Sequence, residues 1–128
     1  MALALVAAVS CAACGAADRA PDATRTATAF QAALERNDGR AACSRLSPET
    51  ATALAQDEHT PCAKAIVELN LPTATEVARA KVYVTSAAAE VPGGDWMFLD
   101  EAPSGWEISA AGCRRTQPDL PLDCELEN

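Results

Sequence analysis

Large apolar side chains are scarce in this chain of 128 residues. Hydrophobic residues make up 49% of it, but 30 of them are alanine and 6 are cysteine. Valine, isoleucine, leucine, methionine, phenylalanine and tryptophan together number 26, and five of these lie in the first ten positions. The other 21 can build the core of one modest domain but not of two, and a small core leaves little net stability. Covalent crosslinks would therefore be of particular value.

The first part of the sequence contains an apolar run at positions 2–9, followed by Ser10 and Cys11. Such a run is too short to cross a bilayer as a helix, but it suits the apolar region of an export signal. A small residue directly before a cysteine resembles a bacterial lipoprotein signal, which implies cleavage before Cys11 and acylation of that cysteine. Cys14 is the alternative lipidation site, and ordinary cleavage after Ala17 or a buried N-terminal helix are the remaining alternatives.

We therefore expect a signal segment at residues 1–10, a lipidated cysteine with a flexible tether at 11–21, and a single domain at 22–128. The tether is predicted because residues 15–22 are small, polar and include a proline. No later stretch approaches a membrane-spanning length. We expect the lipid anchor to hold the protein at the outer face of the cell membrane, and secretion is the alternative.

The four cysteines beyond that segment indicate a disulfide framework. Four cysteines allow three pairings, and the sequence alone does not choose among them. We favour Cys43–Cys62 and Cys113–Cys124, because each pair closes a short loop within one half of the domain. Each bond would stabilise the fold by roughly 3 kcal/mol. An even number of cysteines in an exported chain suits an oxidising compartment.

The formal net charge of −8 is concentrated near the C-terminus. Residues 1–89 hold 9 acidic and 8 basic side chains, whereas residues 90–128 hold 9 acidic side chains and only Arg114 and Arg115 as bases. Such a surface repels nucleic-acid phosphates, so a nucleic-acid partner is not expected. Solubility is the favoured explanation of the acidity, ahead of an acidic recognition patch.

Four helices are predicted between residues 21 and 71. The first is capped by Asp22 and ends at Asn37-Asp38-Gly39, and Ser47-Pro48-Glu49 is typical of a helix start. A Thr60-Pro61 pair repeats that signal. Their apolar stripes, which we expect to face the core, are Ala23, Ala27, Phe30 and Leu34; Ala42, Cys43 and Leu46; Ala51, Leu54 and Ala55; and Cys62, Ala65, Ile66 and Leu69.

Beyond Thr73 the apolar period changes to two, which predicts strands over residues 76–85, 87–91, 96–99 and 106–110. Ala78, Ala80, Val82 and Val84 are expected to share the core face of the first. Glycines at 93–94 and 105 favour turns between the later strands. Helices followed by an antiparallel meander predict an α+β domain, with about four helices packed on a curved four-stranded sheet.

Several short matches give the chain a family resemblance. It resembles small exported lipoproteins of high-GC Gram-positive bacteria that look like members of the nuclear transport factor two-like (SnoaL-like) superfamily. The resemblance implies a cone-shaped fold and an extracytoplasmic location, and it brings no assigned reaction and no catalytic residue. The matching positions are Phe30 with Ala33, Cys43 with Leu46, Cys62 with Ala63, Phe98-Leu99, the run 105–113 that starts Gly-Trp and ends Ala-Ala-Gly-Cys, and Asp-Cys-Glu-Leu at 123–126.

Aromatic and branched side chains alternate on two of the predicted strands. Trp96 and Phe98 lie on one, and Trp106 and Ile108 lie on its expected neighbour. Cross-strand neighbours of this kind are usually core residues, and that is the favoured interpretation. The alternative is that all four line a ligand cavity, because a cone with few bulky side chains can leave space inside.

Catalytic candidates are few. The candidate catalytic acids or bases are Tyr83, His59, Asp95 and Asp100. None of them has an evident catalytic partner in the sequence. The spacing of Cys11 and Cys14 is redox-like, but it follows a signal-like run instead of a strand. Zinc bound by His59 with neighbouring cysteines is disfavoured, because there is only one histidine. We expect no metal and no cofactor.

Three functions remain in competition. The favoured one is a non-catalytic, lipid-anchored surface module that binds a partner protein or a small apolar ligand. The second is an isomerase- or hydrolase-type enzyme that uses Asp95, Asp100 or Tyr83. The third is an accessory domain of a membrane complex at the outer face of the membrane.

Overall fold

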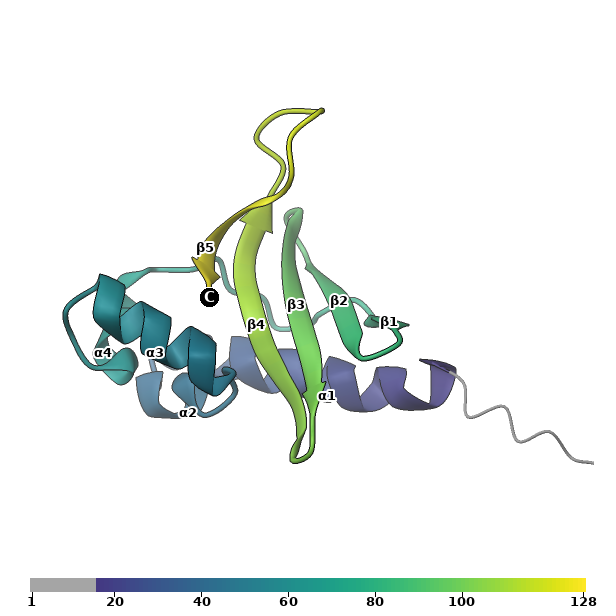
Figure 1. The fold of residues 1–128 in the computed structure, drawn as a ribbon, viewed down its shortest axis with the longest axis horizontal. Coiled ribbons are helices and arrows are strands. Elements are labelled where there is room, and N and C mark those ends of the chain that lie inside the picture. The colour runs from purple at the N-terminus through teal and green to yellow at the C-terminus, as the bar shows by residue number, and fades with distance from the viewer. Residues whose placement is uncertain (1–15) are drawn as a thin grey trace, which may run out of the picture.

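The computed structural model describes residues 16–128, which form four helices followed by a five-stranded antiparallel sheet (Figure 1). The predicted α+β class and the order of helices before strands are confirmed. The strands follow the order β1-β2-β3-β4-β5, so each pairs with its neighbour in sequence. The elements are α1 (Ala16–Glu35), α2 (Gly39–Cys43), α3 (Pro48–Asp57), α4 (Cys62–Glu68), β1 (Lys81–Tyr83), β2 (Ser86–Val91), β3 (Asp95–Ala102), β4 (Gly105–Arg114) and β5 (Asp123–Glu127).

The long helix α1 packs against β1, β2, β3 and β4, and in Figure 1 it passes behind β3 and β4. Its predicted stripe is buried and forms part of the hydrophobic core. However, the helix begins at Ala16, six positions before the expected cap Asp22, and Pro21 lies inside it. Ala20 is buried and Arg19 bonds to the sheet, so the folded domain includes residues that we assigned to a tether. The alanines of this segment favour helix, and these contacts keep it on the domain.

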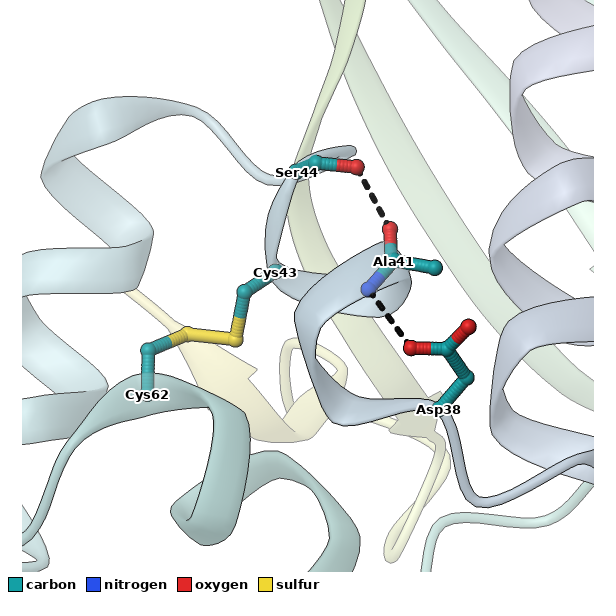
Figure 2. Close-up of a disulfide and its surroundings, with 5 residues drawn as sticks. All are labelled: Asp38, Ala41, Cys43, Ser44 and Cys62. Carbon is teal, nitrogen blue, oxygen red and sulfur yellow. Dashed lines mark hydrogen bonds between the residues drawn. A yellow bond between two sulfur atoms is a disulfide. The ribbon is translucent and has the colours of Figure 1, made fainter.

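The three short helices are held by caps and one disulfide. The side chain of Asp38 caps α2 by accepting a hydrogen bond from the Ala41 amide at 3.0 Å (Figure 2). Ser47 caps α3 in the same way, as predicted. A disulfide joins Cys43, at the end of α2, to Cys62, at the start of α4 (Figure 2). These connections hold the short helices in place.

An irregular segment between α4 and β1 is fixed by polar side chains of α1. Gln31 is buried, and its carboxamide oxygen accepts a hydrogen bond from the Ala74 amide at 3.0 Å. Thr24 accepts one from the Ala80 amide at 2.9 Å. Backbone groups that lack a strand partner are therefore satisfied by side chains.

The first strand is shorter than the sequence predicts. Ala80 is buried and Val82 is half-buried, as expected, but Ala78 is exposed and Val84 is 80% exposed with a φ of 52°. Because Tyr83 pairs with Ser86, Val84 belongs to the hairpin turn and cannot face the core. The expected core position of Val84 is therefore wrong.

The sheet has five strands instead of the predicted four. β5 adds to β4 through the pairs Ala111 with Leu126 and Cys113 with Cys124. The latter pair is also joined by a disulfide, so both disulfides are the ones that the sequence analysis favoured. Leu126 is buried in the hydrophobic core, which makes this last strand part of the domain.

Candidate functional site

Two faces of the sheet differ in what covers them. Met97 and Leu99 are fully buried and point toward α1, so Trp96 and Phe98 point to the opposite face, which we call the outer face. Ala88 lies directly opposite Phe98 in the register, and therefore shares this face. Trp96 and Phe98 are each half-buried. The outer face thus carries large aromatic side chains outside the hydrophobic core.

The four predicted cavity residues do not share one face. Leu99 pairs with Ile108 and Glu101 pairs with Trp106, which turns Ile108 and Trp106 toward the helices, where both belong to the core. The register between β3 and β4 shifts twice, between Trp96 and Phe98 and again between Phe98 and Leu99. Shifts of this kind change which residues lie opposite each other. The favoured core interpretation therefore holds for Trp106 and Ile108 but not for Trp96 and Phe98, and the alternative of one cavity lined by all four does not fit this arrangement.

A hollow lies on the outer face instead. Its volume is about 370 Å³, within the usual range for sites that bind small molecules. Trp96 and Phe98 lie on β3, and the other lining residues come from β1, β2, a turn and the β4–β5 connection. We call this site the aromatic hollow, and its lining residues are Tyr83, Ala88, Gly94, Trp96, Phe98, Arg115 and Leu122.

The β4–β5 connection is braced close to the hollow. The disulfide between Cys113 and Cys124 joins the ends of β4 and β5, and the Arg115 guanidinium donates hydrogen bonds to the carbonyls of Pro118 and Leu120 at 3.2 and 3.1 Å. In Figure 1 this connection projects beyond the end of the sheet. Leu122 is therefore held at the rim of the hollow by covalent and polar contacts.

Sequence reasoning missed Ala88, Arg115 and Leu122 as part of a site. A signal for them was present, because Cys124 and Leu126 alternate with acidic residues at 123–127 as in a half-buried strand. Predicting that strand would have brought the connection with Leu122 beside β4.

The candidate acids and bases do not gather in the aromatic hollow. Asp95 is 3.1 Å from the Arg114 guanidinium, and Asp100 is exposed five positions further along β3, about 17 Å away at the rise of a strand. His59 is exposed in the loop after α3, with a φ of 52°. Tyr83 lines the hollow but is 58% exposed. These four side chains therefore do not form a paired acid and base.

The cysteines within the described residues are all in disulfides, so none is a thiolate that could bind a metal. Across residues 16–128, no group of three or more His, Cys, Asp and Glu side chains is arranged to hold a metal ion. The proposed signal at 1–10 and the lipidation candidates Cys11 and Cys14 lie outside the described residues. No helix in the described part of the chain has the length and apolar character to span a bilayer.

The two disulfides indicate an oxidising, extracytoplasmic environment. Comparison with protein-family models, with curated proteins and with solved structures finds no match to this chain. The function must therefore be argued from the geometry of the site alone.

Proposed function

We propose that this protein is an extracytoplasmic, lipid-anchored module that binds a small apolar ligand in the aromatic hollow, without catalysing a reaction. A protein partner that inserts an apolar side chain into the same hollow is the second candidate. As part of this proposal, the protein is a lipoprotein with the cone-shaped fold of the nuclear transport factor two-like superfamily. Helices that precede an antiparallel sheet and pack on one of its faces support this resemblance.

One observation carries the ligand proposal. The chain has few bulky apolar residues, yet Trp96, Phe98 and Leu122 line a hollow outside the hydrophobic core. Apolar and aromatic side chains that line a concave space are typical of small-molecule binding sites. Aromatic side chains bury a large area for each residue, so they give a flat apolar ligand a strong contact.

The enzyme hypothesis has less support. A carboxylate acid and a carboxylate base that act together must both lie within hydrogen-bond reach of one bound substrate. Asp95 is engaged by Arg114, and Asp100 lies too far along the strand to share a small substrate with it.

A neutral fluorescent apolar probe, N-phenyl-1-naphthylamine, tests the proposal. We expect saturable binding, with energy transfer from Trp96 to the probe. Phe98→Ala should weaken binding by about tenfold, because it removes most of one aromatic contact of 1–2 kcal/mol. The matched control is Leu120→Ala, which removes an exposed apolar side chain that does not line the hollow. Absent binding, or equal loss in both variants, would contradict the proposal.

A further inference from the structure

A second and chemically different space lies where α1 meets the turn between β3 and β4. Its volume is about 440 Å³. In Figure 1 this turn passes in front of α1, at the opposite end of the sheet from the β4–β5 connection. We call it the arginine cleft and define it by six of its lining residues, Arg19, Asp22, Arg25, Arg45, Glu101 and Trp106.

The three arginines of the cleft differ in how they are engaged. Arg19 is committed to the fold, because it donates to the Glu101 carboxylate and, at 2.6 Å, to the Val84 carbonyl. Arg25 forms an ion pair of 2.7 Å with Asp22, three positions away on the same helix, and its side chain is 75% exposed. Pairs this exposed contribute little to stability, so an incoming anion can compete for Arg25.

Arg45 is the free cation of the cleft. Its side chain makes no hydrogen bond or ion pair with any residue in the described part of the chain. Its backbone carbonyl accepts a hydrogen bond from the Ile108 amide at 2.8 Å, which fixes the position of the residue on the edge of the core. A guanidinium held there by its backbone, with every donor available, is suited to a ligand.

Trp106 also lines this space, and its side chain carries a neutral donor. The residue is only 9% exposed. Its indole nitrogen makes no hydrogen bond with the described residues, but this atom is accessible to solvent. An indole N–H is a donor with no acceptor capacity, so it also favours an acceptor-rich ligand.

The net charge of the residues that line the cleft is positive, whereas that of the whole chain is negative. Three guanidinium groups and two carboxylates line it, whereas the whole chain carries −8. A local excess of positive charge within an acidic protein attracts anions to that place alone.

We propose that the arginine cleft binds a phosphate ester. A carboxylate offers two oxygens in one plane and is satisfied by a single guanidinium. A phosphate group offers several oxygens in a tetrahedral arrangement, so it can accept from Arg45, Arg25 and the Trp106 indole at once. The source is either a soluble phosphate ester or the headgroup of an anionic phospholipid. The second source rests on the proposed lipid anchor, since Arg19 stands eight positions from Cys11.

Titration calorimetry with glycerol 3-phosphate tests the soluble source. The protein used is the full chain with Cys11→Ala and Cys14→Ala, so that no acyl group contributes. Arg45→Gln should weaken binding by about tenfold or more, because it removes a charge-assisted contact. The thermal midpoint should stay at its original value, because the Arg45 side chain has no partner in the fold. The matched control is Arg36→Gln, which removes the same charge from an exposed position outside the cleft.

Co-sedimentation with vesicles tests the headgroup source. The same protein should sediment with vesicles of phosphatidylglycerol and not with phosphatidylcholine alone, and Arg45→Gln should abolish sedimentation. Binding from either source supports the proposal. It is overturned if neither binds, if acetate competes as well as phosphate, or if Arg36→Gln weakens binding as much as Arg45→Gln. Probe binding in the aromatic hollow should be unchanged by Arg45→Gln, so failure here and failure of the proposed function are distinguishable.

Discussion

Among the glycines of the described residues, Gly39 makes the closest approach to a neighbouring element. Gly39, the first residue of α2, is buried against α4, and a Cβ added to it would lie 1.7 Å from the Ala63 carbonyl oxygen. A backbone oxygen cannot move aside without shifting α4, which the disulfide at Cys62 ties to α2. Small residues reduce the apolar volume of the core. At Gly39 the small residue also has a structural role, because it allows two helices to approach closely.

Gly39→Ala should destabilise the protein strongly. The clash forces α2 and α4 apart, and overpacking of this kind costs about 3 kcal/mol. Thermal unfolding followed by circular dichroism measures the loss. The control is Arg40→Ala, at an exposed position of the same helix, which should unfold close to the original midpoint. Equal midpoints for Gly39→Ala and the original protein would show that the helices are not packed this closely.

A buried hydroxyl provides a second test at this scale. Thr50 is fully buried in α3, lies 2.8 Å from the Ser47 hydroxyl and donates to the Ser109 carbonyl at 3.0 Å, which links the helix to β4. Thr50→Val keeps the shape but leaves that carbonyl unpaired, so the free energy of unfolding should fall by about 1–3 kcal/mol. Urea unfolding measures the change. Thr52→Val, exposed on the same helix, should have little effect, and a comparable loss there would contradict the assignment.

Among the elements, the helices were the easiest to predict. Their apolar stripes and the cap at Ser47 are local signals. Ser47 caps α3 as expected, and the predicted stripe residues belong to the core or pack against it, except Ala55. The outer face of the sheet was not predictable, because it depends on which residues of β3 and β4 lie opposite each other. Two register shifts near Phe98 decide that, and they arise from the packing of the whole sheet.

The predicted start of α1 was wrong for a related reason. Residues before Asp22 have the composition of a tether, but Arg19 and Ala20 contact the rest of the domain. Contacts between residues 65 and 82 positions apart leave no trace in local composition. The aromatic hollow likewise combines β1, β2, β3 and the β4–β5 connection, so the sequence indicated only Trp96 and Phe98 as apolar lining residues, and Tyr83 only as a candidate acid or base.

The two disulfides should have equal effects on stability but different effects on ligand binding. They span sequence separations of 19 and 11, and each loop closure is worth about 3 kcal/mol. Replacing either pair by alanine should therefore lower the free energy of unfolding by a similar amount. Only the Cys113→Ala, Cys124→Ala variant should weaken probe binding, because it releases the connection that holds Leu122 at the hollow. Equal binding in both variants, measured with N-phenyl-1-naphthylamine below their unfolding midpoints, would refute the link between that disulfide and the site.

At the scale of the whole molecule, the two candidate sites lie on different faces of the sheet and differ in chemistry. Residues of the β4–β5 connection line part of the aromatic hollow, whereas residues of α1 line part of the arginine cleft. Because α1 is the first described element, the cleft is the nearer of the two in sequence to the proposed anchor at Cys11. An anchored protein would then present its cationic cleft toward the lipid headgroups and leave the aromatic hollow available to ligands from outside.

That arrangement requires acylation at Cys11, which can be measured directly. In a bacterial host that processes lipoproteins, we expect the protein in the membrane fraction, and trypsin should release an acylated peptide of residues 11–19, which ends at the first arginine. After a high-salt wash, which screens electrostatic binding of the arginine cleft to lipid headgroups, Cys11→Ala should be absent from the membrane fraction, because the acylated residue is then the only proposed attachment. Cys14→Ala is the matched control and should leave the protein membrane-bound. If Cys14→Ala releases it instead, the anchor lies at Cys14. Protein in the culture medium whose N-terminal sequence starts at Asp18 would show that it is secreted without an anchor.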